Sequence, residues 1–356
     1  MGIDRRSLLG ATATAAALGI ASSAARPALA QPSQGTAPPQ EPAITRPIGR
    51  SGRTVTALGL GTFLTFDLVP GAPRDRLRAV VARYVAGGGG VIDTSPLYGS
   101  AEVTVGAILS EMPAAQDIFL ANKIWSTGEY LGDTSHAQAS LAQSKLRIWR
   151  ERMDLMQCHS ITNAPVIIPL LRAWKKEGDI SLVGITHHES AYQGELTGFI
   201  ERGDVDVVQT NYSIFNRSAE SRLLPAAAAR GVGVLVNMPL EKARLMRIVE
   251  GRPLPDFARD FGARTWAQFF LKWVIAHPAV TCVLCGTSNP DHMSDNLGAM
   301  RGPLPDQAMR ARMVRYMESV PGFDALGTMP WYPGKDALYQ GQIRSAQARA
   351  RARLAD

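Results

Sequence analysis

Short apolar runs alternate with amphipathic segments eight times between residues 58 and 300, and this alternation constrains the fold more than any other feature of the chain. Strands with near-continuous apolar sequence are typical of parallel sheets, whose two faces are both buried. A strand followed by a helix, repeated eight times, favours a closed parallel barrel surrounded by its helices. We therefore expect an α/β protein, a (β/α)8 TIM barrel that occupies residues 44–335.

The repeat assigns each element to a segment of the sequence. The predicted strands cover residues 58–61, 91–94, 118–123, 153–159, 180–186, 205–211, 233–237 and 281–286. The predicted helices cover residues 74–86, 101–110, 137–149, 166–177, 192–202, 219–230, 265–277 and 291–300. The long connections 238–262 and 302–335 belong at the C-terminal face of the barrel, where long loops serve as lids or binding loops.

Residues 44–55 precede the first barrel strand and contain two turn glycines, Gly49 and Gly52. Turn residues between apolar positions predict a β-hairpin, which can close the bottom of the barrel. The four glycines at 87–90 precede a strand, whereas a phosphate-binding loop follows a strand and opens a helix. These glycines are therefore expected to form a turn from a helix into a strand.

The N-terminal residues have the composition of a cleavable export signal. Arg5 and Arg6 come just before an apolar run of small residues, and residues 28–30 read Ala-Leu-Ala, a small-residue cleavage site. Paired arginines resemble the twin-arginine signal, which is read by a dedicated export machinery. A membrane anchor is the weaker alternative because the run is shorter than the ~20 apolar residues of a span. We expect removal of residues 1–30, a Pro/Gln-rich linker at 31–43, and a periplasmic or otherwise exported protein without a stable membrane span.

Part of the formal net charge of +7 lies in the C-terminal segment 336–356, where arginines alternate with alanines. This basic tail is expected to be a solvated helix end, with a nucleic-acid or membrane-binding arm as the alternative. Basic and aromatic residues are not interleaved elsewhere in the sequence, so no nucleic-acid partner is expected.

Cys282 and Cys285 resemble the C-x-x-C redox motif, but they lie within a predicted buried strand. Residues three apart on a strand point to opposite faces, so a disulfide between them is geometrically unfavourable. We expect both cysteines to be core residues.

Four ionisable residues fall where chemistry belongs in such a barrel, near the C-terminal ends of neighbouring strands. Asp93, Lys123 and His159 come at the ends of the second, third and fourth predicted strands, and Tyr98 lies in the loop after the second. Each has an ordinary explanation by itself, such as a helix cap, a solvated charge or a buried structural histidine. Their convergence on one rim favours a catalytic site.

The sequence around these residues resembles the aldo-keto reductase family, in order, from about residue 48 to residue 300. The matching stretches are residues 91–102, 119–123, 153–159, 183–186, 207–212 and 286–292. The stretch that runs from Asp93 to Tyr98 is the most specific. The resemblance implies an NAD(P)H-dependent enzyme that reduces an aldehyde or ketone to an alcohol.

As the resemblance implies, Tyr98 is the general acid of this reaction. Hydride addition to a carbonyl leaves negative charge on oxygen, and a free tyrosine with a pKa of about 10 is a poor proton donor near neutral pH. A nearby cation lowers the pKa of a phenol. Lys123 is expected to supply that cation, with Asp93 keeping it protonated, and His159 is expected to orient the carbonyl oxygen by hydrogen bonding.

The resemblance also implies NADPH as the cofactor, with NADH possible. Thr186 and Gln209 take the positions that hold the nicotinamide amide. His187 stands where many relatives have asparagine, and Asn237 stands where many stack a tyrosine on the nicotinamide. Many relatives bind the 2′-phosphate with Lys and Arg, whereas this chain has a glycine and a weakly charged histidine there, which leaves the choice between NADPH and NADH open. The phosphate and adenine positions are Gly286, Thr287, Ser288, His292, Asp295 and Asn296.

Two other functions compete with carbonyl reduction. A non-catalytic barrel that binds nicotinamide nucleotides, as a sensor or a docking protein, is the main alternative because of the changes at His187 and Asn237. A metal-dependent hydrolase needs converging ligands, but His187 and His188 are adjacent at a strand end and are expected to diverge, so no metal site is expected. Candidates for an apolar pocket wall or for lid packing are Trp125, Met238, Trp331 and Tyr332.

Overall fold

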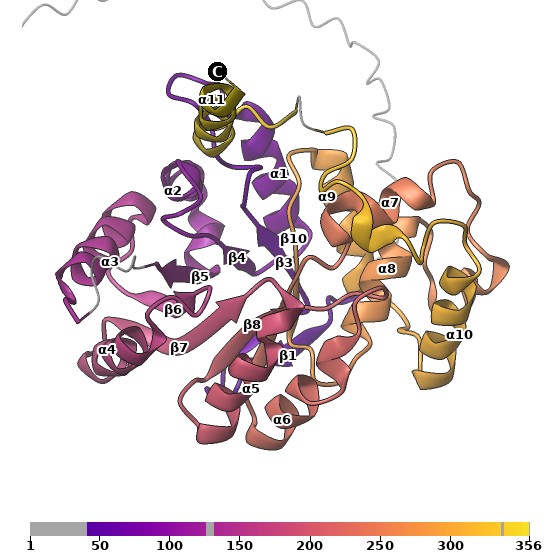
Figure 1. Ribbon diagram of the computed structural model, residues 1–356, viewed down its shortest axis with the longest axis horizontal. Helices are drawn as coiled ribbons and strands as arrows, with labels where there is room; N and C mark the ends of the chain where they lie inside the picture. Colours follow the sequence, from indigo (N-terminus) through magenta and orange to yellow (C-terminus); the bar gives the residue numbers. More distant parts are fainter. Residues whose placement is uncertain (1–40, 126–131, 336–337, 356) are drawn as a thin grey trace, which may run out of the picture. The chain divides into compact units, whose positions relative to one another are not determined.

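The computed structural model describes residues 41–125, 132–335 and 338–355. Eight parallel strands close into a barrel in the order β10-β3-β4-β5-β6-β7-β8-β9, with helices around it (Figure 1). The predicted (β/α)8 barrel is therefore confirmed. The predicted signal, residues 1–30, and residues 31–40 of the predicted linker lie outside the described residues. The barrel strands are β3 (Leu58–Gly61), β4 (Val91–Asp93), β5 (Phe119–Ile124), β6 (Met153–His159), β7 (Ile180–His187), β8 (Val207–Asn211), β9 (Gly233–Asn237) and β10 (Cys282–Cys285).

Helices separate the successive strands, as the repeat predicts. Their ends differ from the prediction by a few residues, because short 3₁₀ turns precede α6 (η4, Ser218–Glu220) and follow α9 (η7, Gly298–Met300). Within the described ranges, no helix is long and apolar enough to cross a membrane. The helices that follow the eight strands are α1 (Asp75–Ala86), α2 (Ala101–Ser110), α3 (Ser135–Ile148), α4 (Ala164–Glu177), α5 (Gln193–Arg202), α6 (Leu223–Arg230), α8 (Trp266–Ile275) and α9 (Pro290–Leu297).

Alternate residues of each strand face the barrel interior, and the intervening residues pack outward against the helices. On β4, Val91 belongs to the inner apolar cluster, whereas Ile92 belongs to the cluster between the strands and the helices. Apolar residues fill the lower interior, so the barrel is a packed core there and not a pore. The inner cluster consists of Ile48, Val55, Val91, Phe119, Ala121, Leu155, Leu182, Val207, Leu235, Cys282 and Leu284.

The predicted hairpin is present as two antiparallel strands, β1 (Thr45–Pro47) and β2 (Thr54–Thr56). Ile48 and Val55 of this hairpin are buried in the inner cluster, so the hairpin closes the bottom of the barrel. Gly49 adopts a positive φ of 55°, and a Cβ atom there would lie 2.7 Å from the carbonyl oxygen of Asp206. Only glycine permits this close approach.

The cysteine and glycine predictions are also confirmed. Cys282 faces the inner cluster and Cys285 the outer one, and both are buried free thiols. Residues 87–90 connect α1 to β4, as expected for a helix-to-strand turn. A Cβ at Gly89 would overlap the ring of Tyr84, at 2.2 Å. This turn is therefore shaped by packing and not by a ligand.

The prediction of a long loop over residues 302–335 is wrong in its first part, because α10 (Gln307–Glu318) lies within it. Asp306 caps the helix by accepting a hydrogen bond from the backbone N–H of Met309, and Met313 and Met317 are buried one turn apart. The cap residue followed by apolar residues at helical spacing was the available signal. The other long connection, 238–262, contains the short helix α7 (Arg244–Ile248) and the 3₁₀ segments η5 (Glu241–Ala243) and η6 (Asp256–Phe261).

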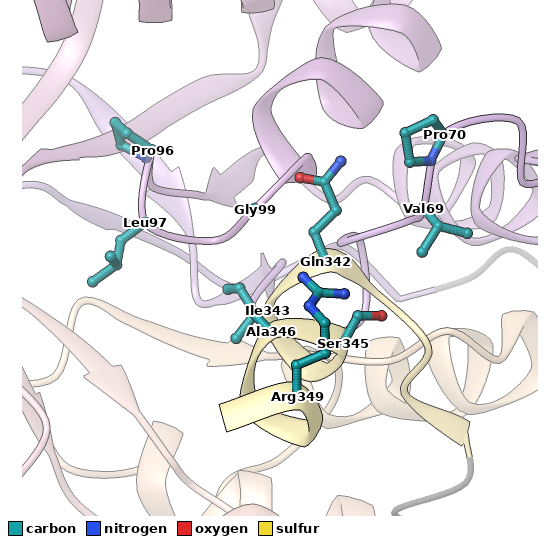
Figure 2. Close-up of a pocket in the computed structure, with 10 residues that line it drawn as sticks. All are labelled: Val69, Pro70, Pro96, Leu97, Gly99, Gln342, Ile343, Ser345, Ala346 and Arg349. Atoms are coloured by element: carbon teal, nitrogen blue, oxygen red, sulfur yellow. The ribbon is translucent and has the colours of Figure 1, made fainter. Parts of the chain in front are cut away.

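The C-terminal tail contains helix α11 (Gln342–Ala355), with exposed arginines toward its end. Its first turn is anchored, because the backbone N–H of Ile343 donates to the carboxylate of Asp67. Figure 2 shows α11 beside the loops after β3 and β4. An open cleft of about 580 Å³ lies between them. The lining includes Val69, Pro96 and Leu97 on one side and Ile343 and Arg349 on the other.

The contact between α2 and α3 gives a stability test. A Cβ atom at Gly106 in α2 would lie 1.9 Å from the carbonyl oxygen of Arg147 in α3. We expect Gly106→Ala to lower the free energy of unfolding by about 2 kcal/mol or more, because overpacking against backbone forces the helices apart. Urea denaturation followed by circular dichroism measures the change.

Gly194→Ala in α5 is the matched control, because a Cβ there meets no atom within 4 Å. Helix propensity alone then favours alanine by up to about 1 kcal/mol. Equal stability of Gly106→Ala and the parent would contradict the close α2–α3 packing.

Candidate active site

The alternation that fills the lower barrel with apolar side chains brings polar ones to its upper, C-terminal end. Asp93 lies two residues beyond the inward-facing Val91 on β4, and Lys123 lies four residues beyond the inward-facing Phe119 on β5. His159 ends the neighbouring strand β6. Because parallel strands end at the same edge of the barrel, these side chains lie close together.

A buried ion pair occupies the centre of this edge. Lys123 Nζ donates to both carboxylate oxygens of Asp93, at 2.7 Å each, and to the backbone oxygen of Thr94 at 2.8 Å. Gln209 Nε2 also donates to Asp93 Oδ1, at 3.2 Å. Lys123 is 1% exposed and Asp93 is 4% exposed. An ammonium group has three N–H donors, so every donor of Lys123 is already used.

Burial shifts the pKa values of this pair in opposite directions. It raises the pKa of Asp93 and lowers the pKa of Lys123, because desolvation disfavours the charged form of each. The attraction between the two groups opposes both shifts. Removal of one partner would leave the other as a buried unpaired charge, which is strongly destabilising.

Tyr98 lies in the loop after β4 and places its ring over this pair. Lys123 Nζ is 4.9 Å from the centroid of the Tyr98 ring, and the His159 ring lies edge-on to it with 5.7 Å between ring centroids. Phe63, in the loop after β3, packs on another side of the Tyr98 ring at 5.0 Å. The structure therefore brings Asp93, Tyr98, Lys123 and His159 together, and Tyr98 is partly exposed at the rim.

The expected net lowering of the Tyr98 pKa is wrong for the free protein. The pKa of Tyr98 is raised well above its usual value of 10, first by burial and then by the negative charge of Asp93. Lys123 is paired with Asp93, so its field does not offset the effects of burial and of Asp93. Its ammonium group is bound by Asp93 and Thr94, so the phenol faces a paired cation. Tyr98 is therefore protonated at neutral pH.

The predicted nicotinamide positions lie at the ends of β7, β8 and β9. Thr186 and Gln209 are buried, and Gln209 Oε1 has no hydrogen-bond partner within the described chain. Asn237 Oδ1 at the end of β9 is also buried without a partner there. His187 Nδ1 accepts a hydrogen bond from the backbone N–H of Glu189 at 3.1 Å, which holds the imidazole in place.

The predicted phosphate and adenine positions lie between the end of β10 and the last turn of α9. Gly286 is exposed directly after β10, and Thr287 Oγ1 accepts from the backbone N–H of Asn289 at 3.0 Å. Asn289 in turn caps α9. Asp295 is tied to the start of α8, since its carboxylate accepts from Thr265 Oγ1 at 2.7 Å and Gln268 Nε2 at 2.8 Å. Of the other predicted positions, Ser288 is half-buried, His292 is exposed and Asn296 is buried.

The expectation that His187 and His188 diverge is wrong. Their rings lie parallel, with an interplanar angle of 4° and 5.4 Å between centroids, and the His187 ring stacks on Tyr192 at 3.8 Å. The strand ends at His187, so His188 no longer follows the strand alternation. In the ranges that the structure describes, no three His, Cys, Asp or Glu side chains form a group that could hold a metal ion.

The segment between α10 and residue 335 reaches this rim. Lys242 Nζ lies 2.9 Å from the centroid of the Trp331 ring, and Trp331 contacts His188 edge-on at 6.0 Å. The backbone N–H of Tyr332 donates to the backbone oxygen of Lys242 at 3.1 Å. Tyr332 also raises the pKa of Tyr98 through its charge, so the two phenols are close. Tyr332 is therefore placed near Tyr98, and Trp331 is placed beside Lys242 and His188.

The other two wall candidates are Trp125 and Met238, and both are half-buried. Trp125 directly follows β5, which carries Lys123. Met238 directly follows Asn237, with its sulfur 3.9 Å from Asn211 Nδ2. Both side chains therefore lie at the C-terminal ends of strands, beside the residues described above.

Sequence reasoning missed two polar residues of this site. Ser95 lies within the stretch from Asp93 to Tyr98, and its position there was the available signal. Lys242 had no signal in the sequence, because it is brought to Trp331 by an unusual backbone path. Glu241, Lys242 and Ala243 all have positive φ values, and the buried ion pair between Glu241 and Arg244 holds this path.

A comparison with protein families identifies the family of the chain. The model of the Aldo/keto reductase family matches residues 57–312, which is most of the chain. The chain belongs to the aldo/keto reductase family. The predicted family is thus confirmed, and Asp93, Tyr98, Lys123 and His159 all lie within the matched range.

Individual aldo/keto reductases resemble this one over most of their length. The chain is 24% identical over 316 residues to the NADH-specific methylglyoxal reductase of Escherichia coli (strain K12), covering 73% of this chain and 94% of that protein. The holo form of aldo-keto reductase AKR11C1 from Bacillus halodurans is 24% identical, with a TM-score of 0.62 over 77% of this chain and 96% of that one. An aldo/keto reductase from Klebsiella pneumoniae in complex with NADP and acetate is 22% identical, with a TM-score of 0.63 over 77% and 95%.

The residues present fit a nicotinamide group at the rim of this aldo/keto reductase. A carboxamide carries both donors and an acceptor, and the buried Gln209 Oε1 and Asn237 Oδ1 are acceptors without a partner within the described ranges. The exposed glycine after β10 and the capped start of α9 suit a phosphate group. Many relatives have a tyrosine at the position of Asn237 and stack it on the nicotinamide. Asn237 has no aromatic ring, so it cannot make this stacking contact.

The burial of the Lys242 ammonium at the rim can be tested through the pH dependence of protein stability. Burial lowers its pKa from 10.5 to about 7, while the unfolded chain keeps the higher value. Between these values the unfolded state binds more protons, so this residue makes the free energy of unfolding rise with pH. Below pH 7 both states are protonated and the contribution is constant.

We therefore expect the parent protein to gain stability relative to Lys242→Met between pH 7 and pH 9. Urea denaturation of both proteins at several pH values measures this difference, and the variant keeps an apolar side chain on Trp331. A difference that does not change with pH would contradict the burial of this ammonium.

Proposed function

We propose that this aldo/keto reductase uses NADPH, or NADH, to reduce an aldehyde or ketone to an alcohol, with Tyr98 as the proton donor. One observation carries the proposal: a partly exposed phenol lies over a buried lysine–aspartate pair, with a histidine ring at its edge. The nicotinamide, when bound, supplies the hydride. The protein must orient the carbonyl, exclude water and give a proton to the oxygen.

The raised pKa of Tyr98 is compatible with this role. The phenol is protonated at neutral pH, so the donor is present whenever a carbonyl binds. Hydride adds to the carbonyl carbon, and the carbonyl oxygen becomes an alkoxide. An alkoxide is a stronger base than a phenolate, so proton transfer from Tyr98 to this oxygen runs downhill. The reverse reaction requires the phenolate and is therefore favoured by alkaline pH.

Lys123 and Asp93 set the electrostatic conditions for this transfer. All three ammonium donors are bound to Asp93 and Thr94, so Lys123 acts on the phenolate through its field across the Tyr98 ring. The cation favours the phenolate as it forms, when the proton has left. Asp93 fixes the ammonium at the distance this requires and keeps it charged.

His159 is placed to hold the carbonyl oxygen as a neutral group. Its pKa is lowered well below 6.5, by burial first and then by the charge of Lys123. A neutral imidazole donates one hydrogen bond and does not compete with Tyr98 as an acid. It therefore orients the oxygen while the phenol supplies the proton.

The proposed nucleotide and substrate class rest on the similarity to two relatives and on the chemistry of the site. The relative from Escherichia coli is named an NADH-specific methylglyoxal reductase, and the structure from Klebsiella pneumoniae contains NADP. Gly286 and His292 stand where many relatives have Lys and Arg, which supports use of both nucleotides. A screen of aldehydes and ketones, including methylglyoxal, tests the substrate class. The absorbance of NADPH or NADH is followed with each compound.

Tyr98→Phe separates the enzyme from a nucleotide-binding sensor. The ring and its contacts remain, but the proton donor is lost, so we expect kcat to fall by about 100-fold or more while nucleotide affinity stays near that of the parent. Steady-state kinetics and fluorescence titration measure the two quantities.

Tyr316→Phe on α10 is the matched control, since it removes a phenol that packs on Trp266 and Phe257 outside the site. We expect normal turnover in this variant. Equal turnover of Tyr98→Phe and the parent would instead favour the sensor function.

We also propose that residues 1–30 direct export of the folded protein to the periplasm by the twin-arginine machinery. The adjacent arginines, the mildly apolar run and the Ala-Leu-Ala site support this. A barrel exported in the folded state can bind its nucleotide before it leaves the cytoplasm.

The double change Arg5→Lys and Arg6→Lys keeps the charge and removes the arginine pair. We expect it to leave the uncleaved protein in the cytoplasm, because the machinery reads the arginine pair itself. Cell fractionation and the intact mass of the protein give the result in a bacterial host with this export system. Equal export of the variant and the parent would rule out the twin-arginine route.

A further inference from the structure

Ser95 makes a buried contact with His159 that the proposed reaction does not yet use. Ser95 Oγ lies 3.1 Å from His159 Nδ1, and the two residues are 0% and 8% exposed. Ser95 follows β4 in the loop that carries Tyr98, whereas His159 ends β6. The contact therefore joins the loop of the proton donor to the strand of the carbonyl-orienting ring.

The other hydrogen bonds of Ser95 decide which atom donates. A hydroxyl group has one proton and two lone pairs. Ser95 Oγ accepts the backbone N–H of Leu97 at 3.1 Å, which uses one lone pair. Within the described chain, the hydroxyl proton has no acceptor besides His159 Nδ1. If Nδ1 carried the proton, the buried hydroxyl would be left as a donor without a partner, which is costly.

The role of Nδ1 as an acceptor determines whether the other ring nitrogen, Nε2, carries a proton. A neutral imidazole carries one proton, so an Nδ1 that accepts from Ser95 requires an Nε2 that donates. Nε2 makes no hydrogen bond with the described part of the chain. It is thus available to donate to a carbonyl oxygen beside Tyr98. The opposite tautomer would present a lone pair to that oxygen and repel it.

We propose that Ser95 is a positioning residue that selects the Nε2–H tautomer of His159 and so provides the hydrogen-bond donor for the substrate carbonyl. The catalytic part of this inference rests on the proposed function, whereas the tautomer itself does not. The titratable groups that face His159 are Lys123 on β5, Tyr98 after β4, and His187 and His188 at the end of β7. The nearby cation and the burial keep the ring neutral, as the selection of one tautomer requires.

The direct test is the ¹⁵N chemical shifts of the histidine rings in the full-length protein labelled on histidine. The chain has six histidines, and His159→Asn assigns the signal. We expect His159 to carry its proton on Nε2 in the parent at neutral pH. In Ser95→Ala we expect a mixture of both tautomers, because Nδ1 has lost its donor. A parent ring protonated on Nδ1 would overturn the proposal, even if Ser95→Ala did not fold.

Kinetics then connects the tautomer to the reaction. We expect Ser95→Ala to lower kcat by about ten-fold, the loss of roughly one transition-state hydrogen bond. Nucleotide affinity should be unchanged, since Ser95 contacts His159 and not the predicted cofactor positions. Ser95→Thr, which keeps the hydroxyl, is expected to retain the Nε2–H tautomer and most of kcat. An unchanged tautomer and unchanged kcat in Ser95→Ala would refute the role of Ser95.

Ser144→Ala is the matched control for loss of a buried hydroxyl. Ser144 donates to the buried Glu102 at 2.6 Å, in a network that joins α2, α3 and Asn122 of β5 and makes no contact with His159. We expect this variant to lose stability without a change in the His159 signals. A parent that reduces none of the carbonyls would contradict the catalytic role, whereas the ring shifts would still decide the tautomer.

Discussion

Closure of the parallel sheet is the constraint on which this molecule depends. Eight strands that share one narrow interior must send every second side chain into it. The lower layers accept apolar side chains such as Val91 and Phe119, and the hairpin residue Ile48 closes them from below. The same alternation carries Asp93 and Lys123 to the upper edge, so the packing rule that builds the core also assembles the site.

The buried Asp93–Lys123 pair and the burial of Tyr98 together set the conditions for proton transfer. Its ammonium group is saturated by Asp93 and the Thr94 carbonyl, so it stabilises a phenolate only by its field. Burial raises the pKa of Tyr98 and thereby keeps the proton on the donor until a more basic oxygen forms. Burial thus keeps Tyr98 in the protonated form, which is the form that gives a proton in reduction.

Orientation at this edge comes from contacts between segments far apart in the sequence. Ser95 fixes one nitrogen of His159, and Gln209 reaches across to Asp93. The segment after α10 places Trp331 against Lys242, and Lys242 is held there by a stretch of backbone with positive φ values. These contacts bring residues from the ends of β4, β6 and β8 and from the segment after α10 to the edge that holds Tyr98.

The sequence by itself determined the barrel, the hairpin and the opposite orientation of Cys282 and Cys285, because strand alternation is local and repeats along the chain. It also identified Asp93, Tyr98, Lys123 and His159, since strand ends meet at one edge in any such barrel. Only the tertiary structure decided the raised pKa of Tyr98, the parallel histidine rings and the contacts of Ser95 and Lys242. Burial and the direction of a hydrogen bond depend on neighbours from distant segments, and these are set only when the barrel has closed.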